Sequence, residues 1–216
     1  MKKIDFVFYS YPIQEEFKDT ALYKKAAGLG ALINFDTYNN VLSISKVTDE
    51  LIKATIDSHI EDTESKNYEE ELPPFEGGLR IEKDDLSIDY QCCADLGDAV
   101  EWEKVISKKS QTWKQIWIGH PWIFYRYNGV NIELSEYYDD IPDDDDIQGK
   151  MTWSRGAFAT ELNQALADLE IFKERLYKVI DAGNYDNKEV LKRKLIFQQM
   201  VSNPHLQMGD TSSIYE

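Results

Sequence analysis

The pattern of hydrophobic and polar residues in the first third of the chain predicts short strands and helices. Residues 4–9 (IDFVFY) have the aromatic and β-branched content of a strand, and residues 41–47 (VLSISKV) alternate as a half-buried strand does. Between them, residues 14–33 carry apolar side chains at helical spacing. Thr48 is the expected N-cap of a further helix that has isoleucines on one side.

Two β-hairpins are predicted in the middle of the chain. Strand-like runs flank a polar turn at residues 83–85, and a second pair of runs flanks Asn128-Gly129, the strongest short hairpin signal. Hairpins pair their strands antiparallel, and strands and helices do not alternate regularly along this chain. We therefore predict an α+β fold, in which an antiparallel sheet built from hairpins at about 79–94 and 122–137 packs against helices.

Three helices are expected in the second half of the chain. Asp98 and Glu101 form a D-x-x-E capping pattern, which predicts a helix that extends to Trp117. Apolar residues at helical spacing then predict a C-terminal helical pair, at about residues 155–180 and 186–201.

Length and composition are those of a folded protein. The 216 residues include 42% hydrophobic residues, enough for a substantial core. We expect a single α+β domain over residues 1–216, and the alternative is a subdivision into a sheet-containing part, 1–150, and a helical part, 151–216. No apolar run reaches the roughly 20 residues that a membrane helix needs. No sequence motif calls for a cofactor, and a monomer or weak homodimer is expected.

The negative charge is concentrated in one window of the sequence. The formal net charge is −16, and residues 31–150 contain 27 of the 40 Asp and Glu residues but 11 of the 24 Lys and Arg residues. This balance argues against direct binding of nucleic acid, which needs clustered Lys and Arg. It favours instead a partner that carries positive charge.

The densest acidic run is Asp143, Asp144, Asp145 and Asp146. Hard cations bind several carboxylates, but consecutive acids point in different directions, and the spacing of a calcium loop is absent. We predict a solvated acidic loop or docking surface here, and no metal site.

The two cysteines are adjacent, at Cys92 and Cys93, so they cannot form a disulfide framework. A reducing cytoplasm is the expected location. Together with His120 the pair invites a soft metal, but neighbours on a strand face opposite sides of a sheet, and zinc cysteines are usually two to four residues apart. We expect one thiol in the core and the other under a helix.

His120 lies in the apolar segment WIGHPW. One hypothesis makes it the acid or base of a small hydrolase or transferase, with Asp95 or Glu133 as its carboxylate partner. The other makes it an ordered corner in which the imidazole satisfies nearby backbone groups. We favour the corner, and no enzyme is predicted.

The second hairpin is rich in large rings. Strand alternation places Trp122 and Phe124 on one face, and Tyr125 and Tyr127 on the other. One face packs on helices. The other is either exposed, where Tyr and Trp would anchor a partner, or covered, so that both faces belong to a core.

The leading functional hypothesis is an acidic, non-enzymatic, cytoplasmic binding protein that neutralises or masks a basic protein partner, of which a toxin domain is one candidate. In general character the chain resembles the small acidic immunity proteins that bacteria make against nuclease-type toxins; the resemblance is one of type and rests on no family motif. The alternative to binding or catalysis is a scaffold domain that dimerises through its C-terminal helices. The predicted binding residues are acids and rings: Glu69, Glu70, Glu71, Trp122, Tyr125, Tyr127, Asp139, Asp140, Asp143, Asp144, Asp145 and Asp146.

Overall fold

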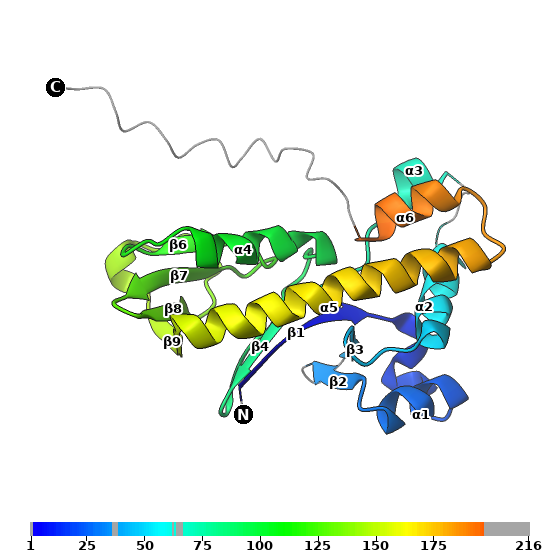
Figure 1. Ribbon diagram of the computed structural model, residues 1–216, viewed down its shortest axis with the longest axis horizontal. Helices are drawn as coiled ribbons and strands as arrows, with labels where there is room; N and C mark the ends of the chain where they lie inside the picture. Colours follow the sequence, from blue (N-terminus) through cyan, green and yellow to red (C-terminus); the bar gives the residue numbers. More distant parts are fainter. Residues whose placement is uncertain (1, 36–38, 62, 64–66, 197–216) are drawn as a thin grey trace.

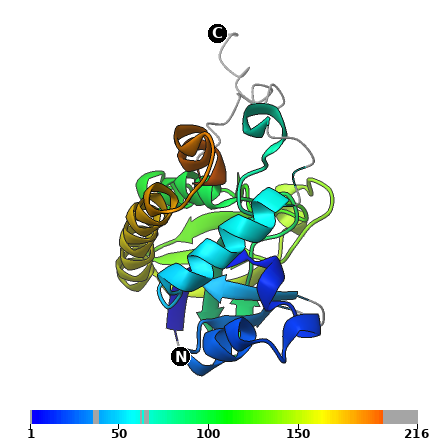
Figure 2. The same ribbon diagram turned by 90° about the vertical axis from the view of Figure 1, so that its right-hand side faces the viewer.

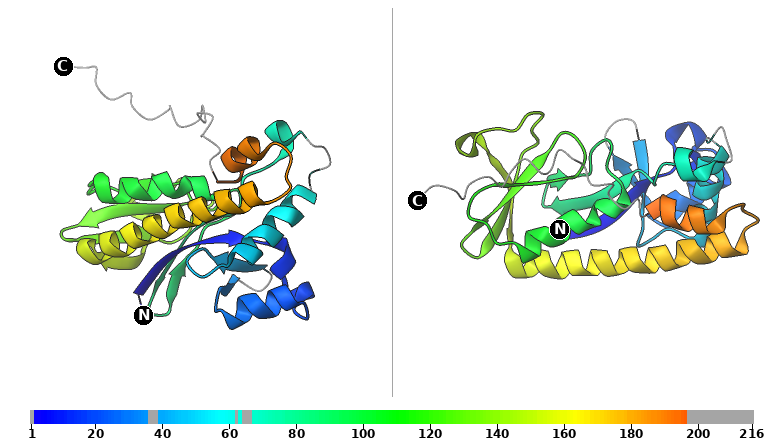
Figure 3. Two further views of the ribbon diagram at one scale, coloured as in Figure 1. Left: turned by 45° about the vertical axis from the view of Figure 1, so that its right-hand side comes forward. Right: turned by 90° about the horizontal axis from the view of Figure 1, so that it is seen from above.

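The computed structural model describes residues 2–35, 39–61, 63 and 67–196. These residues form an α+β fold in which two antiparallel sheets pack against helices, as predicted (Figure 1). A long helix, α5 (Arg155–Ala182), runs past both sheets and is followed by the shorter α6 (Lys188–Ile196), which confirms the C-terminal helical pair (Figure 3).

The first sheet has five strands in the order β2-β3-β1-β4-β5. Every neighbouring pair in it is antiparallel, and β1 forms the long central pairing with β4, from Lys2 opposite Lys83 to Phe8 opposite Gly77. The strands are β1 (Lys2–Tyr9), β2 (Leu32–Phe35), β3 (Asn39–Ser43), β4 (Gly77–Lys83) and β5 (Leu86–Ile88).

The second sheet is a meander of four antiparallel strands. Its central hairpin is the predicted one, but the turn lies one residue later than predicted. Asn128 is the last residue of β7 and pairs with Asn131, so the turn residues are Gly129 and Val130, and Gly129 takes the positive φ of 64° that the turn requires. The strands are β6 (Lys114–Ile116), β7 (Ile123–Asn128), β8 (Asn131–Ser135) and β9 (Gly149–Ser154).

One buried hydrophobic cluster includes residues of both sheets, and α5 connects them. Phe158, near the start of α5, packs on Trp153 of β9 with ring centroids 5.9 Å apart. Four turns later Phe172 packs on Phe8 of β1 at 5.1 Å. Figure 2 shows α5 beside α2 (Asp49–Glu61), which it contacts at the end of the molecule.

The remaining helices are short. They are α1 (Ala21–Gly28), α3 (Tyr68–Glu71) and α4 (Ala99–Ser107), together with the 3₁₀ turns Tyr11–Ile13, Glu15–Phe17, Leu96–Asp98 and Asp144–Asp146. Among the described helices, none combines the length and the apolar character that a membrane span requires.

Two predicted helices are wrong in extent. The segment 14–33 is α-helical only in α1, where the Thr20 side chain accepts a hydrogen bond from Tyr23 N, and its end belongs to β2. The helix predicted from Asp98 to Trp117 ends at Ser107, since Ile116 pairs with Ile123 in the second sheet. Strand pairing there replaces the helix that local spacing favoured.

The capping box also differs from the prediction by three residues. Asp95 and Asp98 cap each other's backbone around the 3₁₀ turn, while Glu101 is buried and forms an ion pair with Lys104. The predicted strand 86–94 ends at Ile88. The predicted end of the last helix, at about Val201, falls outside the described residues.

Candidate functional site

The acidic loop, defined here as residues 139–146, lies between β8 and β9 and is closed at its base by hydrogen bonds. Glu136 N donates to Gln148 O at 3.0 Å. The Tyr138 hydroxyl accepts a hydrogen bond from Gln148 N at 2.6 Å and donates one to Asp146 O at 3.2 Å. These contacts join the two ends of the loop, so the loop is held in place by its own flanking residues.

A small hydrophobic cluster anchors the loop from below. Ile147, which directly follows it, is 8% exposed and packs with Trp113 and Phe124, and Tyr138 packs against the same cluster. The ring of Phe124 meets that of Tyr138 edge-on, with centroids 5.9 Å apart. This cluster covers the face of the second sheet that does not belong to the main core, so both faces of the hairpin are covered.

The loop directs its carboxylates to solvent. Asp139, Asp140 and the four consecutive aspartates are all exposed, and none of their carboxylates makes an ion pair with another described residue. In their midst Ile141 is 68% exposed. The predicted solvated loop is therefore present, and it carries an exposed aliphatic side chain that the sequence analysis did not single out.

The other predicted acids lie at a different place in the molecule. Glu69, Glu70 and Glu71 form α3, which contacts α6 at the end of the molecule opposite the four-stranded sheet (Figure 1). Glu69 forms an ion pair with Arg193, and Glu70 accepts a hydrogen bond from Asn67. The two groups of predicted acids therefore lie on different elements of the fold.

Two of the predicted aromatic anchors are core residues. Tyr125 is 3% and Tyr127 is 7% exposed, and their hydroxyls donate to the backbone carbonyls of Lys108 and Val105. Burial raises the pKa of both phenols. Trp122 is half-buried, exchanges two backbone hydrogen bonds with Tyr138, and so helps to support the acidic loop.

The imidazole of His120 contacts the backbone of the acidic loop. Nε2 of the exposed imidazole lies 2.9 Å from the carbonyl oxygen of Asp139, and the ring packs edge-on against Trp122. The two carboxylates considered as its catalytic partners are engaged elsewhere: Asp95 accepts from Gly97 N, and Glu133 pairs with Arg126. This arrangement matches the ordered-corner hypothesis, because the imidazole interacts with a backbone carbonyl group.

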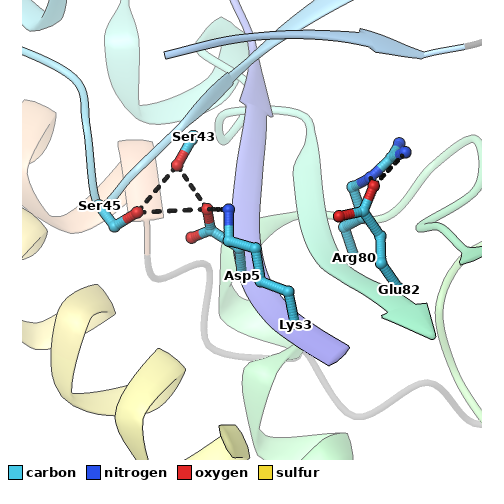
Figure 4. Close-up of polar contacts among 6 residues, drawn as sticks. All are labelled: Lys3, Asp5, Ser43, Ser45, Arg80 and Glu82. Carbon is cyan, nitrogen blue, oxygen red and sulfur yellow. Dashed lines mark hydrogen bonds and ion pairs between the residues drawn. The ribbon is translucent and has the colours of Figure 1, made fainter. Parts of the chain in front are cut away.

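Figure 4 shows a polar cluster on the first sheet that sequence reasoning missed. Asp5 alternates along β1 with the core residues Ile4 and Phe6, so the cluster lies on the side away from the main core. The Asp5 carboxylate, which is 4% exposed, accepts hydrogen bonds from Lys3 Nζ at 2.9 Å, Ser45 Oγ at 3.3 Å and Ser43 Oγ. Beside it on β4, Arg80 pairs with Glu82 at 2.8 Å. Oδ2 of Asp5 accepts all three hydrogen bonds and Ser43 is wholly buried, so the cluster joins strands and offers no exposed nucleophile.

The stripe of leucines on α5 is used within the chain. Leu162, Leu169 and Leu176 are between 0% and 3% exposed, and Leu166 packs against the same core. Dimerisation of a scaffold domain through this stripe would need the leucines to be exposed, and they are buried in the chain's own core instead.

Within the described ranges, no group of three or more His, Cys, Asp or Glu side chains is arranged to hold a metal ion. Comparison with known proteins gives no further guide, because no family model, curated protein or solved structure matches the chain. The acidic loop, with its anchoring cluster and the His120 corner, is the best candidate for a functional site.

Proposed function

We propose that this protein binds a basic protein partner through the acidic loop. The observation that carries the proposal is that six exposed carboxylates on one short loop make no ion pair with any other described residue. A single exposed carboxylate contributes little binding energy, but a group of one sign creates a field that accelerates association and selects partners of the opposite charge.

The anchoring of the loop supports the same proposal. Binding costs free energy when a mobile segment must be ordered, and a loop that is already held in place reduces that cost. Here Tyr138 joins the loop ends and Ile147 fixes them to the sheet. Ile141, exposed among the aspartates, would supply apolar contact inside a polar rim, which is the usual composition of an interface.

A nuclease-type toxin domain is the partner class that best fits this chemistry. Such a domain must hold phosphate groups with cationic side chains, and an acidic loop would occupy the same surface. The immunity-type role deepens the binding proposal and depends on it. A cytoplasmic location, which the adjacent cysteines suggested, stays a prediction.

The test begins with purification of the tagged protein from its own host at low salt, and identification of a stoichiometric basic partner that is lost at high salt. Dissociation constants are then measured for the wild type and for a variant in which Asp143, Asp144, Asp145 and Asp146 are all replaced by Asn. We expect the variant to bind at least about tenfold more weakly, mainly through a slower association rate, and with a smaller dependence on salt.

The matched control removes a comparable charge at the other end of the molecule, by replacing Glu69, Glu70 and Glu71 with Gln. We expect this control to bind as the wild type does. Equal losses in the two variants would mean that net charge alone acts, and wild-type affinity in the loop variant would remove the loop from the interface. Either result overturns the proposal.

A further inference from the structure

The two cysteines of the chain occupy an unusual place for this residue type. Free cysteine is among the most buried of all residues, because it behaves as a small hydrophobe. Here Cys92 and Cys93 are the only two cysteines, they are adjacent, and both are free and exposed. The prediction of one thiol in the core and one under a helix is wrong, and packing does not account for their presence.

The backbone at this pair departs from the strand that the sequence predicted. Cys93 has a φ of 69°, in the left-handed region that L-residues with a Cβ rarely adopt. Cys92 is fixed next to it: its carbonyl accepts from His120 N at 3.2 Å, and its thiol donates to His120 O at 3.1 Å. Residues held in sparsely populated conformations cluster at functional sites.

The two thiols also interact with each other. A hydrogen bond with the Cys92 thiol, followed by the charge that Cys92 carries when ionised, raises the pKa of the Cys93 thiol. The argument that neighbouring cysteines face opposite sides holds for a strand, and this turn is not a strand. Both cysteines are exposed to solvent, and because they are consecutive residues outside a strand, strand alternation does not keep their sulfur atoms apart.

We propose that Cys92 and Cys93 form a vicinal dithiol that low-molecular-weight disulfides oxidise reversibly to an intrachain disulfide. In the first step one thiolate attacks the disulfide, forms a mixed disulfide and releases one small thiol. In the second step the neighbouring thiolate attacks the protein sulfur of the mixed disulfide and releases the second small thiol. The protein loses two protons and two electrons, and the small disulfide gains them. This inference is independent of the proposed function.

The surroundings favour this chemistry over a structural metal site. Zinc is held by four ligands as a rule, and within the described residues no third His, Cys, Asp or Glu side chain completes a group with the two sulfurs. A disulfide needs the two sulfur atoms alone.

Because the thiolate is the reactive form and the pKa of Cys93 is raised, oxidation should accelerate from neutral to mildly alkaline pH.

The experiment incubates the reduced full chain with oxidised glutathione, in buffers from neutral to mildly alkaline pH. We expect both free thiols to disappear, the intact mass to fall by two hydrogens, and no glutathione to remain attached. A dithiol reductant should restore both thiols. Peptide mapping should place the bond between the two adjacent cysteines.

Two single variants supply the control, Cys92→Ser and Cys93→Ser. Each keeps one exposed thiol and should retain one glutathione, because no second thiol can release it. Phenylarsine oxide, whose arsenic bridges two neighbouring thiols with loss of water, should bind the wild type at one per chain and neither variant. Wild-type chains that retain glutathione, or that form disulfide-linked dimers, overturn the proposal. So does bridging by the arsenical without formation of the disulfide.

Discussion

The indole Nε1 of Trp117 donates a hydrogen bond of 3.1 Å to Oδ2 of Asp98, and so links the segment after β6 to the start of α4. The same oxygen accepts from the backbone N–H of Asp95, whose own carboxylate accepts from Gly97 N at 2.6 Å. Two half-buried carboxylates are therefore held next to each other. Burial raises the pKa of Asp95, and it raises the pKa of Asp98 from 3.8 to about 7.

We predict that Asp98 makes the protein less stable as the pH rises. A carboxyl whose folded-state pKa is raised binds its proton more tightly in the folded state than in the unfolded state. The stability that Asp98 contributes is therefore fully present below pH 3.8 and is lost as the pH rises to about 7. Asp98→Asn keeps an oxygen acceptor for Trp117 and carries no charge. The substitution should raise the free energy of unfolding at pH 8 by about 1–2 kcal/mol. The effect is no larger because the carboxylate is partly exposed to solvent.

Urea unfolding of both proteins at pH 5 and pH 8 measures this effect. The exposed Asp144→Asn is the control and should follow the wild-type pH profile. If Asp98→Asn destabilises the protein equally at both pH values, the hydrogen bonds of Asp98 matter more than its charge, and the prediction is wrong.

The Asp5 carboxylate is predicted to stabilise the first sheet. It receives hydrogen bonds from Lys3, Ser43 and Ser45, and its side chain is 4% exposed. Asp5→Asn leaves the ammonium group of Lys3 without its counter-charge at a partly buried position. We expect the free energy of unfolding to fall by about 1–3 kcal/mol.

The neighbouring ion pair between Arg80 and Glu82 provides the comparison. The Glu82 side chain is 36% exposed, so Glu82→Gln should change the free energy of unfolding by about 0.5 kcal/mol or less. Denaturant titration of both variants gives the two values. Equal effects would show that the buried network contributes no more than a surface ion pair.

The α5 helix provides a test that separates folding from self-association. Leu169 is 3% exposed and Ile171 is 56% exposed, two positions apart on the same helix. Leu169→Ala should lower the free energy of unfolding by about 2–5 kcal/mol, and Ile171→Ala should change it by about 0.5 kcal/mol or less. The unfolding midpoints should not depend on protein concentration. A concentration-dependent midpoint that Leu169→Ala abolishes would instead support dimerisation through this helix.

The hairpin of β7 and β8 could be predicted from sequence because its signal is local. Gly129 readily takes the positive φ that a two-residue turn needs, and the turn at Gly129 and Val130 sets the register of the strands beside it. The edge strand β6 could not be predicted in the same way. Its residue Ile116 shares a helical spacing with Trp113, and only pairing with Ile123, seven residues later, makes the segment a strand.

The candidate site could likewise be predicted from the sequence only where the signal is local. Four consecutive aspartates repel one another, so an exposed loop followed from the sequence, and the structure places it in solvent. Strand alternation separated Tyr125 from Phe124 correctly, but alternation does not say what covers each face. The C-terminal end of α4 covers Tyr127, whose hydroxyl donates to Val105 O, and Ile147 covers Phe124. Both covering groups come from distant positions in the sequence.

Tyr138 should control how well the acidic loop is ordered. Its hydroxyl is the acceptor for Gln148 N at 2.6 Å and the donor to Asp146 O at 3.2 Å, so Tyr138→Phe removes both hydrogen bonds and keeps the ring that packs on Phe124. We expect the free energy of unfolding to fall by about 1 kcal/mol, and the amide of Gln148 to exchange its hydrogen faster. If the loop binds a basic partner, the looser loop should bind it several-fold more weakly, because ordering must then be part of binding.

The adjacent Tyr137→Phe is the matched control for this prediction. The Tyr137 hydroxyl accepts from Asp89 N at 2.7 Å, on a different segment, so its loss should leave the exchange rate of Gln148 unchanged. Hydrogen exchange followed residue by residue in both variants separates the two cases. Unchanged exchange at Gln148 in Tyr138→Phe would mean that the packing of Ile147 alone holds the loop. Replacing Ile147 with Ala should then release the loop, because the buried side chain would be its remaining attachment to the sheet.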